Sequence, residues 1–345
     1  MEYRKLGRTD IEISVIGLGT MTWGLQNTQE EGFGQMDYAL ERGINFFDTA
    51  ELYAIPPSAE TYGTTETIIG NWFASRGRRD RVILASKITG PGLDWIRGGG
   101  PIDKNSLQQA LDGSLQRLQT DYIDLYQLHW PNRGSYHFGQ IWDYAPDFDA
   151  RAEEENFLEV LTTLQGFIEA GKIRHIGLSN ETAWGTMKYL QLAEKHGLPR
   201  MVSIQNEYSL LCRHFEPDLY EISLAEDIGL LAWSPLSRGM ISGKYLDGAR
   251  PEGARITIET RPEHRLVPMV DDAIRDYMAL AAQHGLDVCQ MALAFVHSRP
   301  FVTSTLIGAT TMDQLKSNID SIELKLSDEV LQGITKLRQK YAALF

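Results

Sequence analysis

Four side chains that could transfer a proton follow three successive apolar runs of this 345-residue chain. Asp48 ends the first run and Tyr53 follows five residues later, while Lys87 and His129 end the next two runs. A single aspartate at a strand end is often a helix cap, and a single lysine usually reaches solvent. It would be a considerable coincidence for Asp48, Lys87 and His129 to occupy equivalent positions after neighbouring runs without a common role. We therefore expect them to share one site.

Proton transfer to a developing alkoxide is the chemistry that explains this combination. The hydroxyl of a tyrosine has an ordinary pKa of about 10, which is too high for efficient proton exchange near neutrality. An ammonium on Lys87 would lower the pKa of Tyr53, and Asp48 would keep a buried lysine charged. His129 could donate a hydrogen bond to a substrate carbonyl oxygen or help to relay the proton. We therefore expect Tyr53 to be the acid of a four-residue catalytic set.

The elements that must position these groups are eight short β-branched runs that alternate with amphipathic stretches. The predicted strands are Val15–Leu18, Ile44–Phe47, Val82–Ser86, Tyr122–Leu128, Ile173–Leu178, Val202–Gln205, Gly229–Trp233 and Thr303–Ile307. The predicted helices are Gln29–Arg42, Glu66–Ser75, Ser106–Leu118, Asn156–Ala170, Thr182–His196, Asp218–Asp227, Val270–His284, Val288–His297 and Asp328–Ala343. Strands that alternate with helices pair in parallel through right-handed crossovers.

Eight such units predict an α/β fold, a closed (β/α)8 TIM barrel, over one domain spanning residues 1–345. A hairpin over Tyr3–Glu12 is expected to close the barrel bottom, and Asp328–Ala343 is expected to be an extra C-terminal helix. Three stretches are too long for the repeat and follow strands two, four and seven: Ala54–Thr65, Asn132–Glu155 and Arg238–Pro268. Loops after barrel strands form the catalytic face, so we expect these loops to border the site.

The aromatic side chains of the middle loop have two equally good interpretations. They are Tyr136, His137, Phe138, Trp142, Tyr144 and Phe148. They could pack over the barrel rim or contact the substrate directly. With Trp23, Trp95 and Trp130, they favour an apolar or aromatic pocket.

Composition narrows the function classes. A net charge of −13 does not favour a nucleic-acid partner. No apolar run reaches the roughly 18 residues of a membrane span, and the polar N-terminus lacks an apolar signal segment, so we expect a cytoplasmic protein.

Cys212 and Cys289 have no partners at the spacing of metal ligands, so we expect both to be buried small side chains and expect no metal site. No Gly-x-Gly-x-x-Gly follows a strand, which argues against a Rossmann cofactor site.

Several segments together resemble the aldo-keto reductase superfamily. They are Gly43–Tyr53, Ala85–Lys87, Asp124–Pro131 and Gly171–Asn180, and the likeness covers essentially the whole chain. It is closest to the Tas-type members, through Pro56-Pro57, Gly70-Asn71-Trp72 and Gly308–Asn318. The resemblance implies a (β/α)8 barrel that uses NADP(H) to reduce aldehydes or ketones. It also implies the catalytic tetrad Asp48, Tyr53, Lys87 and His129.

The same resemblance implies where the cofactor binds. Ser179, Asn180 and Gln205 occupy positions that hydrogen-bond the nicotinamide carboxamide, and Trp233 occupies the position that stacks on its ring. The other implied cofactor residues are Gly19, Thr20, Met21, Asp48, Ser234, Pro235, Leu236, Arg238, Lys244, Gly308, Thr310, Gln314 and Asn318. Each has a plainer interpretation: Ser179-Asn180 could cap a helix, Trp233 could pack on the rim, and Gly308 could form a turn.

The chain departs from the family pattern in two places. Tyr53 is followed by Ala-Ile-Pro-Pro instead of glycine, so we expect substrate access to differ from that of relatives. The stretch Gly308-Ala309-Thr310 lacks the basic residue that many relatives place beside the adenosine 2′-phosphate. Preference for NADPH over NADH then depends on Arg255, Arg261 or Arg265, with some contact from the Thr310 hydroxyl.

Two other functions remain open. A Schiff-base aldolase would use Lys87 as nucleophile, although Asp48 would keep that lysine charged. A non-catalytic, cofactor-binding regulatory subunit is the other alternative, since some related barrels associate with channels. The sequence does not identify the carbonyl substrate or the oligomeric state.

Overall fold

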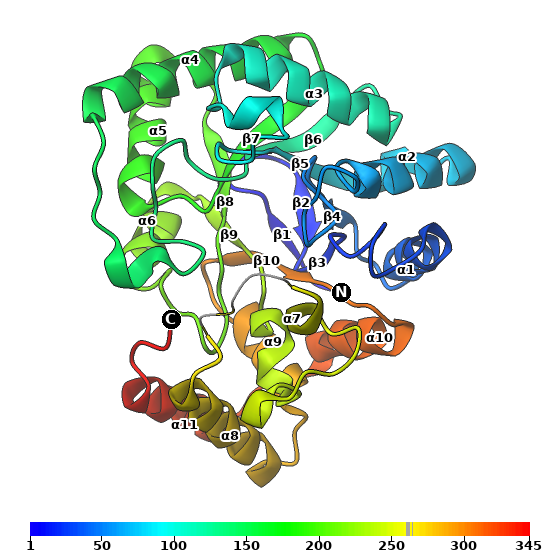
Figure 1. Ribbon diagram of the computed structural model, residues 1–345, viewed down its shortest axis with the longest axis vertical. Coiled ribbons are helices and arrows are strands. Elements are labelled where there is room, and N and C mark those ends of the chain that lie inside the picture. Colours follow the sequence, from blue (N-terminus) through cyan, green and yellow to red (C-terminus); the bar gives the residue numbers. More distant parts are fainter. Residues whose placement is uncertain (260–262, 264) are drawn as a thin grey trace.

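The computed structural model describes residues 1–259, 263 and 265–345 (Figure 1). In this part of the chain, eight parallel strands close into a barrel in which each strand pairs with the next and the last pairs with the first. These strands are β3 (Ile16–Gly19), β4 (Phe46–Asp48), β5 (Ile83–Ile88), β6 (Ile123–Leu128), β7 (Ile173–Ser179), β8 (Met201–Gln205), β9 (Gly229–Ala232) and β10 (Val302–Ile307). The predicted (β/α)8 barrel is confirmed.

Helices surround the barrel on its outer side (Figure 1). They are α1 (Gln29–Glu41), α2 (Thr64–Arg76), α3 (Lys104–Leu118), α4 (Ala150–Glu169), α5 (Ala183–His196), α6 (Asp218–Glu226), α8 (Pro268–Gln283), α9 (Val288–His297), α10 (Met312–Asp320) and α11 (Asp328–Lys340). The short helix α7 (Arg255–Ile258) lies in the long loop after β9. Among the described residues, no helix alone has the length and apolar character to cross a membrane. Helices α8 and α9 together have the length and composition of a membrane span, but the chain bends by 92° between them.

Helix α4 corrects the predicted end of the middle loop. It begins at Ala150 rather than Asn156, because the Asp149 side chain accepts hydrogen bonds from the backbone N–H groups of Arg151 and Ala152. An aspartate at this position satisfies helix donors that would otherwise lack partners. The stretch predicted as loop through Glu155 therefore ends at Asp149.

The N-terminal hairpin closes the barrel bottom, as predicted. Strands β1 (Tyr3–Lys5) and β2 (Glu12–Ser14) pair antiparallel. Leu6 and Ile13 are fully buried and join an apolar cluster with Phe46, Leu125 and other residues of the barrel strands. Gly7 has φ +57, and a Cβ there would lie 2.5 Å from the carbonyl oxygen of Val202, so the tight approach of this turn requires glycine.

Strand register brings the catalytic candidates to one end of the barrel. Asp48 pairs with Ala85 across β4 and β5, and Lys87 pairs with Gln127 across β5 and β6. The backbone N–H of His129 donates to the carbonyl oxygen of Ile88 at 3.0 Å. Since all these strands are parallel, their carboxyl ends meet at one face, where the long loops also lie.

Candidate active site

A buried ion pair lies at the centre of the site. Lys87 is fully buried, and its Nζ lies 2.6 Å from Asp48 Oδ2 and 2.7 Å from the carbonyl oxygen of Thr49. The side-chain amides of Gln127 and Gln205 donate to Asp48 Oδ1 at 3.1 and 2.8 Å. Burial acts to lower the pKa of Lys87, but Asp48 and Tyr53 together outweigh burial and the pKa is raised. Lys87 is therefore a fixed positive charge.

Tyr53 lies against this charge. Its hydroxyl is 3.4 Å from Lys87 Nζ. Burial raises the pKa of Tyr53 above its ordinary value, and the positive charge of Lys87 offsets only part of that rise. Lys87 does act to lower the pKa of Tyr53, as expected, but the net change is a rise because burial has the larger effect. The phenol is thus a neutral hydrogen-bond donor held beside an ammonium.

His129 completes the set as a neutral ring. Burial and the charge of Lys87 hold the pKa of His129 well below its ordinary value. The edge of its ring meets the Tyr53 ring, with the centroids 5.8 Å apart. The Asn180 amide donates to the backbone oxygen of His129 at 2.9 Å. A neutral imidazole can donate one hydrogen bond to a carbonyl oxygen placed near Tyr53.

Tyr53 and His129 open onto a cavity of about 930 Å³. This volume lies within the range of small-molecule and cofactor sites. Every residue that the family resemblance assigned to the cofactor lines the cavity: Gly19, Thr20, Met21, Asp48, Ser179, Asn180, Gln205, Trp233, Ser234, Pro235, Leu236, Arg238, Lys244, Gly308, Thr310, Gln314 and Asn318. The structure therefore brings the predicted residues around one space, with Lys87 buried beneath it.

At the end of the cavity near Tyr53, hydrogen bonds fix the polar groups. The Ser179 hydroxyl donates to the carbonyl oxygen of Gln205 at 2.9 Å. The Trp233 indole N–H donates to Asn180 Oδ1 at 3.2 Å. Asn180 has φ +52, a left-handed conformation that asparagine tolerates better than most residues. These bonds hold a flat aromatic ring and several amide groups in fixed positions next to Tyr53.

At the other end, the loop after β10 is held against α10. Thr310 donates from its backbone N–H and its hydroxyl to Gln314 Oε1, at 3.0 and 3.1 Å. The Asn318 amide donates to the carbonyl oxygen of Gly308 at 3.3 Å. Thr311 caps α10, whose N-terminus borders the cavity. Anions favour such a helix end.

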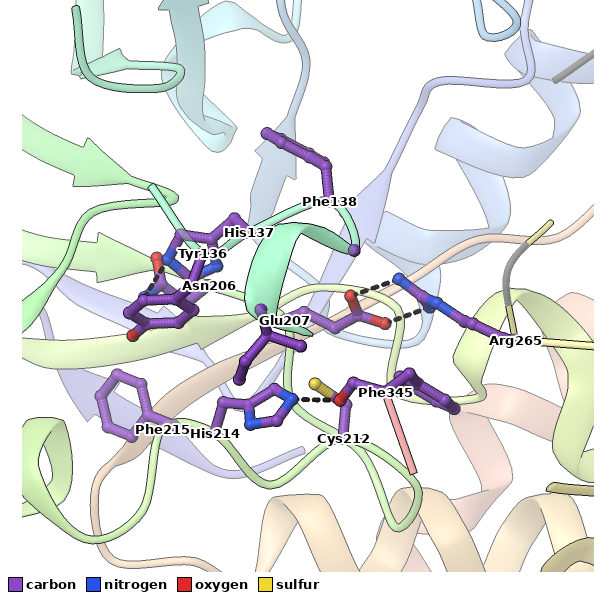
Figure 2. Close-up of a pocket in the computed structure, with 12 residues that line it drawn as sticks. Tyr136, His137, Phe138, Asn206, Glu207, Cys212, His214, Phe215, Arg265 and Phe345 are labelled. Atoms are coloured by element: carbon purple, nitrogen blue, oxygen red, sulfur yellow. Dashed lines mark hydrogen bonds and ion pairs between the residues drawn. The ribbon is translucent and has the colours of Figure 1, made fainter. Parts of the chain in front are cut away.

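The three arginine candidates have different surroundings. Arg255 lines the cavity, and its buried Nε has no hydrogen-bond partner among the described residues. Burial lowers the pKa of Arg255 to about 10, so the group is still charged at neutral pH. Arg265 instead makes a two-point ion pair with Glu207, at 2.6 and 2.9 Å, beside Phe345 in a separate small pocket (Figure 2). Arg261 lies outside the described residues.

Some aromatic residues belong to the cavity and others do not. Phe138 and Trp130 line it, and the Phe138 ring stacks near Trp233 with centroids 6.1 Å apart. Trp142 is 60% exposed and Trp23 is fully buried, so neither forms part of this pocket. Cys212 is buried as predicted, whereas Cys289 is only partly buried at the cavity.

Gln127 is a site residue that the sequence interpretation missed. Its amide holds the Asp48 carboxylate, and it also accepts a hydrogen bond from Gln205 at 3.1 Å. Gln127 precedes His129 by two positions in a strand-end run. Since side chains two apart in a strand share a face, this spacing was an available signal.

The comparisons with known proteins agree with this geometry. The model of the "Aldo/keto reductase family" matches residues 15–339. The chain belongs to the aldo/keto reductase family. It is 49% identical to "Protein tas" of Escherichia coli strain K12 over 344 residues, which covers 99% of each chain. It is also 35% identical to the "Uncharacterized oxidoreductase YrpG" of Bacillus subtilis strain 168, over 98% of this chain and 96% of the relative.

A fungal relative has a named activity. The chain is 32% identical to the "Norsolorinic acid reductase stcV" of Emericella nidulans, over 94% of this chain and 78% of the relative. Family membership and these oxidoreductase relatives make the protein an oxidoreductase of a carbonyl-reducing family.

The pKa directions predict a flat pH profile for carbonyl reduction. His129 stays neutral because its pKa is lowered, and Tyr53 stays protonated because its pKa is raised, so kcat/KM should change little between about pH 6 and 9. Loss of the Tyr53 proton should begin only above about pH 10. The measurement is kcat/KM across a pH series at constant ionic strength, and a titration step near pH 6.5 would contradict the assignment of a neutral His129.

Proposed function

We propose that the protein reduces aldehydes or ketones to alcohols with NADPH, with Tyr53 as the general acid. The observation that carries the proposal is the position of the Tyr53 hydroxyl, 3.4 Å from a fully buried, carboxylate-paired lysine at the wall of a large cavity. An acid, a fixed charge and a neutral histidine meet at this one place. A carbonyl oxygen that gains negative charge needs these groups.

The cavity suits a nicotinamide dinucleotide. Ser179, Asn180 and Gln205 would bind the carboxamide, and Trp233 would cover one face of the ring. The loop from Ser234 to Lys244 would follow the pyrophosphate, and Gly308, Thr310, Gln314 and Asn318 would border the adenosine. Lys244 and Arg255 supply positive charge along this path, which suits phosphate groups. When bound, the cofactor supplies the hydride.

The chain's own residues then bind and protonate the carbonyl oxygen of the substrate. Tyr53 and His129 donate hydrogen bonds that orient the carbonyl, and their donation strengthens as charge develops on its oxygen. Tyr53 gives up its proton to that oxygen, and Lys87 stabilises the phenolate that remains. Asp48, held by the amides of Gln127 and Gln205, keeps Lys87 in place.

The surroundings of Tyr53 favour an apolar carbonyl compound. Trp130, Phe138 and Trp233 contribute aromatic surface, and Ile55 and Leu93 contribute aliphatic surface. Flat apolar compounds bury well against such walls. The relative named norsolorinic acid reductase supports a reductase role.

The aldolase alternative loses support from the same geometry. A nucleophilic lysine must lose its proton, whereas the Asp48 carboxylate raises the pKa of Lys87. We extend the proposal to the whole chain: residues 1–345 act as one catalytic domain in the cytoplasm, on small carbonyl compounds. The net charge of −13 does not suit a nucleic-acid partner.

Replacing Tyr53 by phenylalanine tests the proposed acid. Tyr53→Phe removes only the hydroxyl, so we expect kcat for reduction to fall by about 100- to 10,000-fold. The Kd for NADPH, measured by quenching of tryptophan fluorescence, should stay nearly unchanged. Equal loss of turnover and NADPH binding would contradict the role of Tyr53. Tight NADPH binding by a wild-type protein that reduces no carbonyl would favour the regulatory-subunit function instead.

Replacing Arg255 by methionine tests the preference for NADPH. Because a hydrogen bond to a charged group contributes about 1.5–3 kcal/mol, Arg255→Met should weaken NADPH binding by about tenfold or more. NADH lacks the 2′-phosphate, so its Kd should change much less. Fluorescence titration with both cofactors measures the ratio. An equal loss for NADPH and NADH would place Arg255 at the pyrophosphate rather than at the 2′-phosphate.

A further inference from the structure

Glu51 is a fully buried carboxylate that the proposed reaction does not use. It lies two residues before Tyr53, and its backbone N–H donates to the carbonyl oxygen of Lys87 at 3.3 Å. A buried charge is costly unless its oxygens are well bonded. Both oxygens of Glu51 are bonded, and the partners come from two different loops at the catalytic face.

The first loop joins β4 to α2. The Tyr62 hydroxyl donates to Glu51 Oε2 at 2.7 Å, and the backbone N–H of Gly63 donates to the carbonyl oxygen of Glu51 at 2.9 Å. This is the loop in which the sequence departs from the family pattern. Its far end is therefore tied back to a residue next to the acid.

The second loop follows β5. Arg97 donates to both oxygens of Glu51, at 2.8 and 2.6 Å, and the backbone N–H of Thr89 donates to Oε1 at 2.7 Å. Arg97 also donates to the carbonyl oxygen of Thr89 at 3.3 Å, so the beginning and the middle of this loop meet at Glu51. Burial alone would raise the pKa of Glu51, but Arg97, Tyr62 and the backbone N–H of Thr89 together outweigh burial and the pKa is lowered. Glu51 is thus charged at neutral pH.

The two loops also contact each other outside Glu51. The edge of the Trp95 ring meets Tyr62, with centroids 6.0 Å apart, and the Arg117 guanidinium lies 5.0 Å from the centre of the Tyr62 ring. Arg117 is itself held by Glu66 at 2.7 Å. Tyr62 is therefore fixed on several sides.

On their inner side, the same two loops form part of the cavity wall near Tyr53. Ile55 and Pro57 come from the first loop, and Pro91 and Leu93 come from the second. We call these four residues the apolar wall. The Ile55 N–H donates to the carbonyl oxygen of Met21 at 2.9 Å, but no backbone hydrogen bond joins the described residues 54–63 to residues 89–99. The position of one loop relative to the other therefore depends on side-chain contacts such as those of Glu51.

We propose that Glu51 is a positioning residue that joins these loops through Tyr62 and Arg97 and so sets the apolar wall against which the apolar body of the carbonyl substrate packs. The inference rests on the proposed reductase function and deepens it. Glu51 does not contact the substrate. It acts through the wall, so its loss should change recognition of bulky substrates more than it changes the chemistry of small ones.

Tyr62→Phe is the mildest test, because it removes one hydroxyl and leaves the Glu51–Arg97 ion pair intact. The substrates are 4-nitrobenzaldehyde, which is bulky enough to reach the wall, and propanal, which is not. For 4-nitrobenzaldehyde we expect KM to rise by about five- to tenfold, because only part of the free energy of the lost hydrogen bond is transmitted to the substrate through the wall. The kcat for propanal and the Kd for NADPH should stay within about twofold of wild type. Glu51→Gln should shift the same substrate ratio further.

Tyr341→Phe is the matched control. It removes a hydroxyl that donates to the Asp276 carboxylate at 2.8 Å, beyond the end of α11 and outside the cavity. This control should leave the ratio of kcat/KM for the two aldehydes unchanged. An unchanged ratio in a folded Tyr62→Phe and a folded Glu51→Gln protein would overturn the proposal.

Hydrogen exchange gives a readout that does not need turnover. In Tyr62→Phe and Glu51→Gln, backbone amides of residues 54–63 and 89–99 should exchange faster than in wild type, while those of β5 and β6 should not. If the wild-type protein binds NADPH but reduces neither aldehyde, the proposed reductase function is wrong, and this result alone does not decide the role of Glu51 in joining the loops. If exchange in both loops matches wild type, the role of Glu51 fails, whatever the activity.

Discussion

The ion pair between Lys87 and Asp48 is the interaction on which the rest of the site depends. A lysine with no solvent exposure is costly to keep charged, and a buried ion pair seldom adds net stability compared with apolar residues. Here Asp48 Oδ1 accepts hydrogen bonds from the amides of Gln127 and Gln205, and Asp48 Oδ2 accepts one from Lys87. Lys87 also donates to the carbonyl oxygen of Thr49. We infer that the pair is retained because it places a fixed positive charge beneath the hydroxyl of Tyr53.

The barrel explains how these groups reach one another from distant parts of the chain. Asp48 and Gln205 are 157 residues apart, yet the barrel ends of β4 and β8 place them within hydrogen-bond distance. The N-terminal hairpin closes the opposite end of the barrel, so the site lies at the carboxyl ends of the strands. Loops add an aromatic surface and cationic side chains to the cavity. In our proposal they also add, through Glu51, an apolar wall beside Tyr53.

The sequence predicts the barrel well because its signals are local. Each strand is a short β-branched run, and a residue directly after such a run must lie at the catalytic face. That logic locates Asp48, Lys87 and His129, and family likeness adds the residues around the cavity. Long-range pairing is harder to predict. Nothing in the local pattern around Arg265 indicates its ion pair with Glu207, and nothing around Glu51 indicates that Tyr62 and Arg97 converge on it. The net pKa of Tyr53 likewise depends on burial, which only the folded chain defines.

The rate of hydride transfer in a Lys87→Met variant tests the central claim most directly. Stopped-flow absorbance would follow NADPH oxidation in a single turnover, and the double variant Asp48→Asn/Lys87→Met would remove both charges together. We expect both proteins to fold and to bind NADPH, and the single-turnover rate of each to fall by about 100-fold or more because the phenolate loses its stabilising charge. Transfer at the wild-type rate in either folded variant would contradict the account.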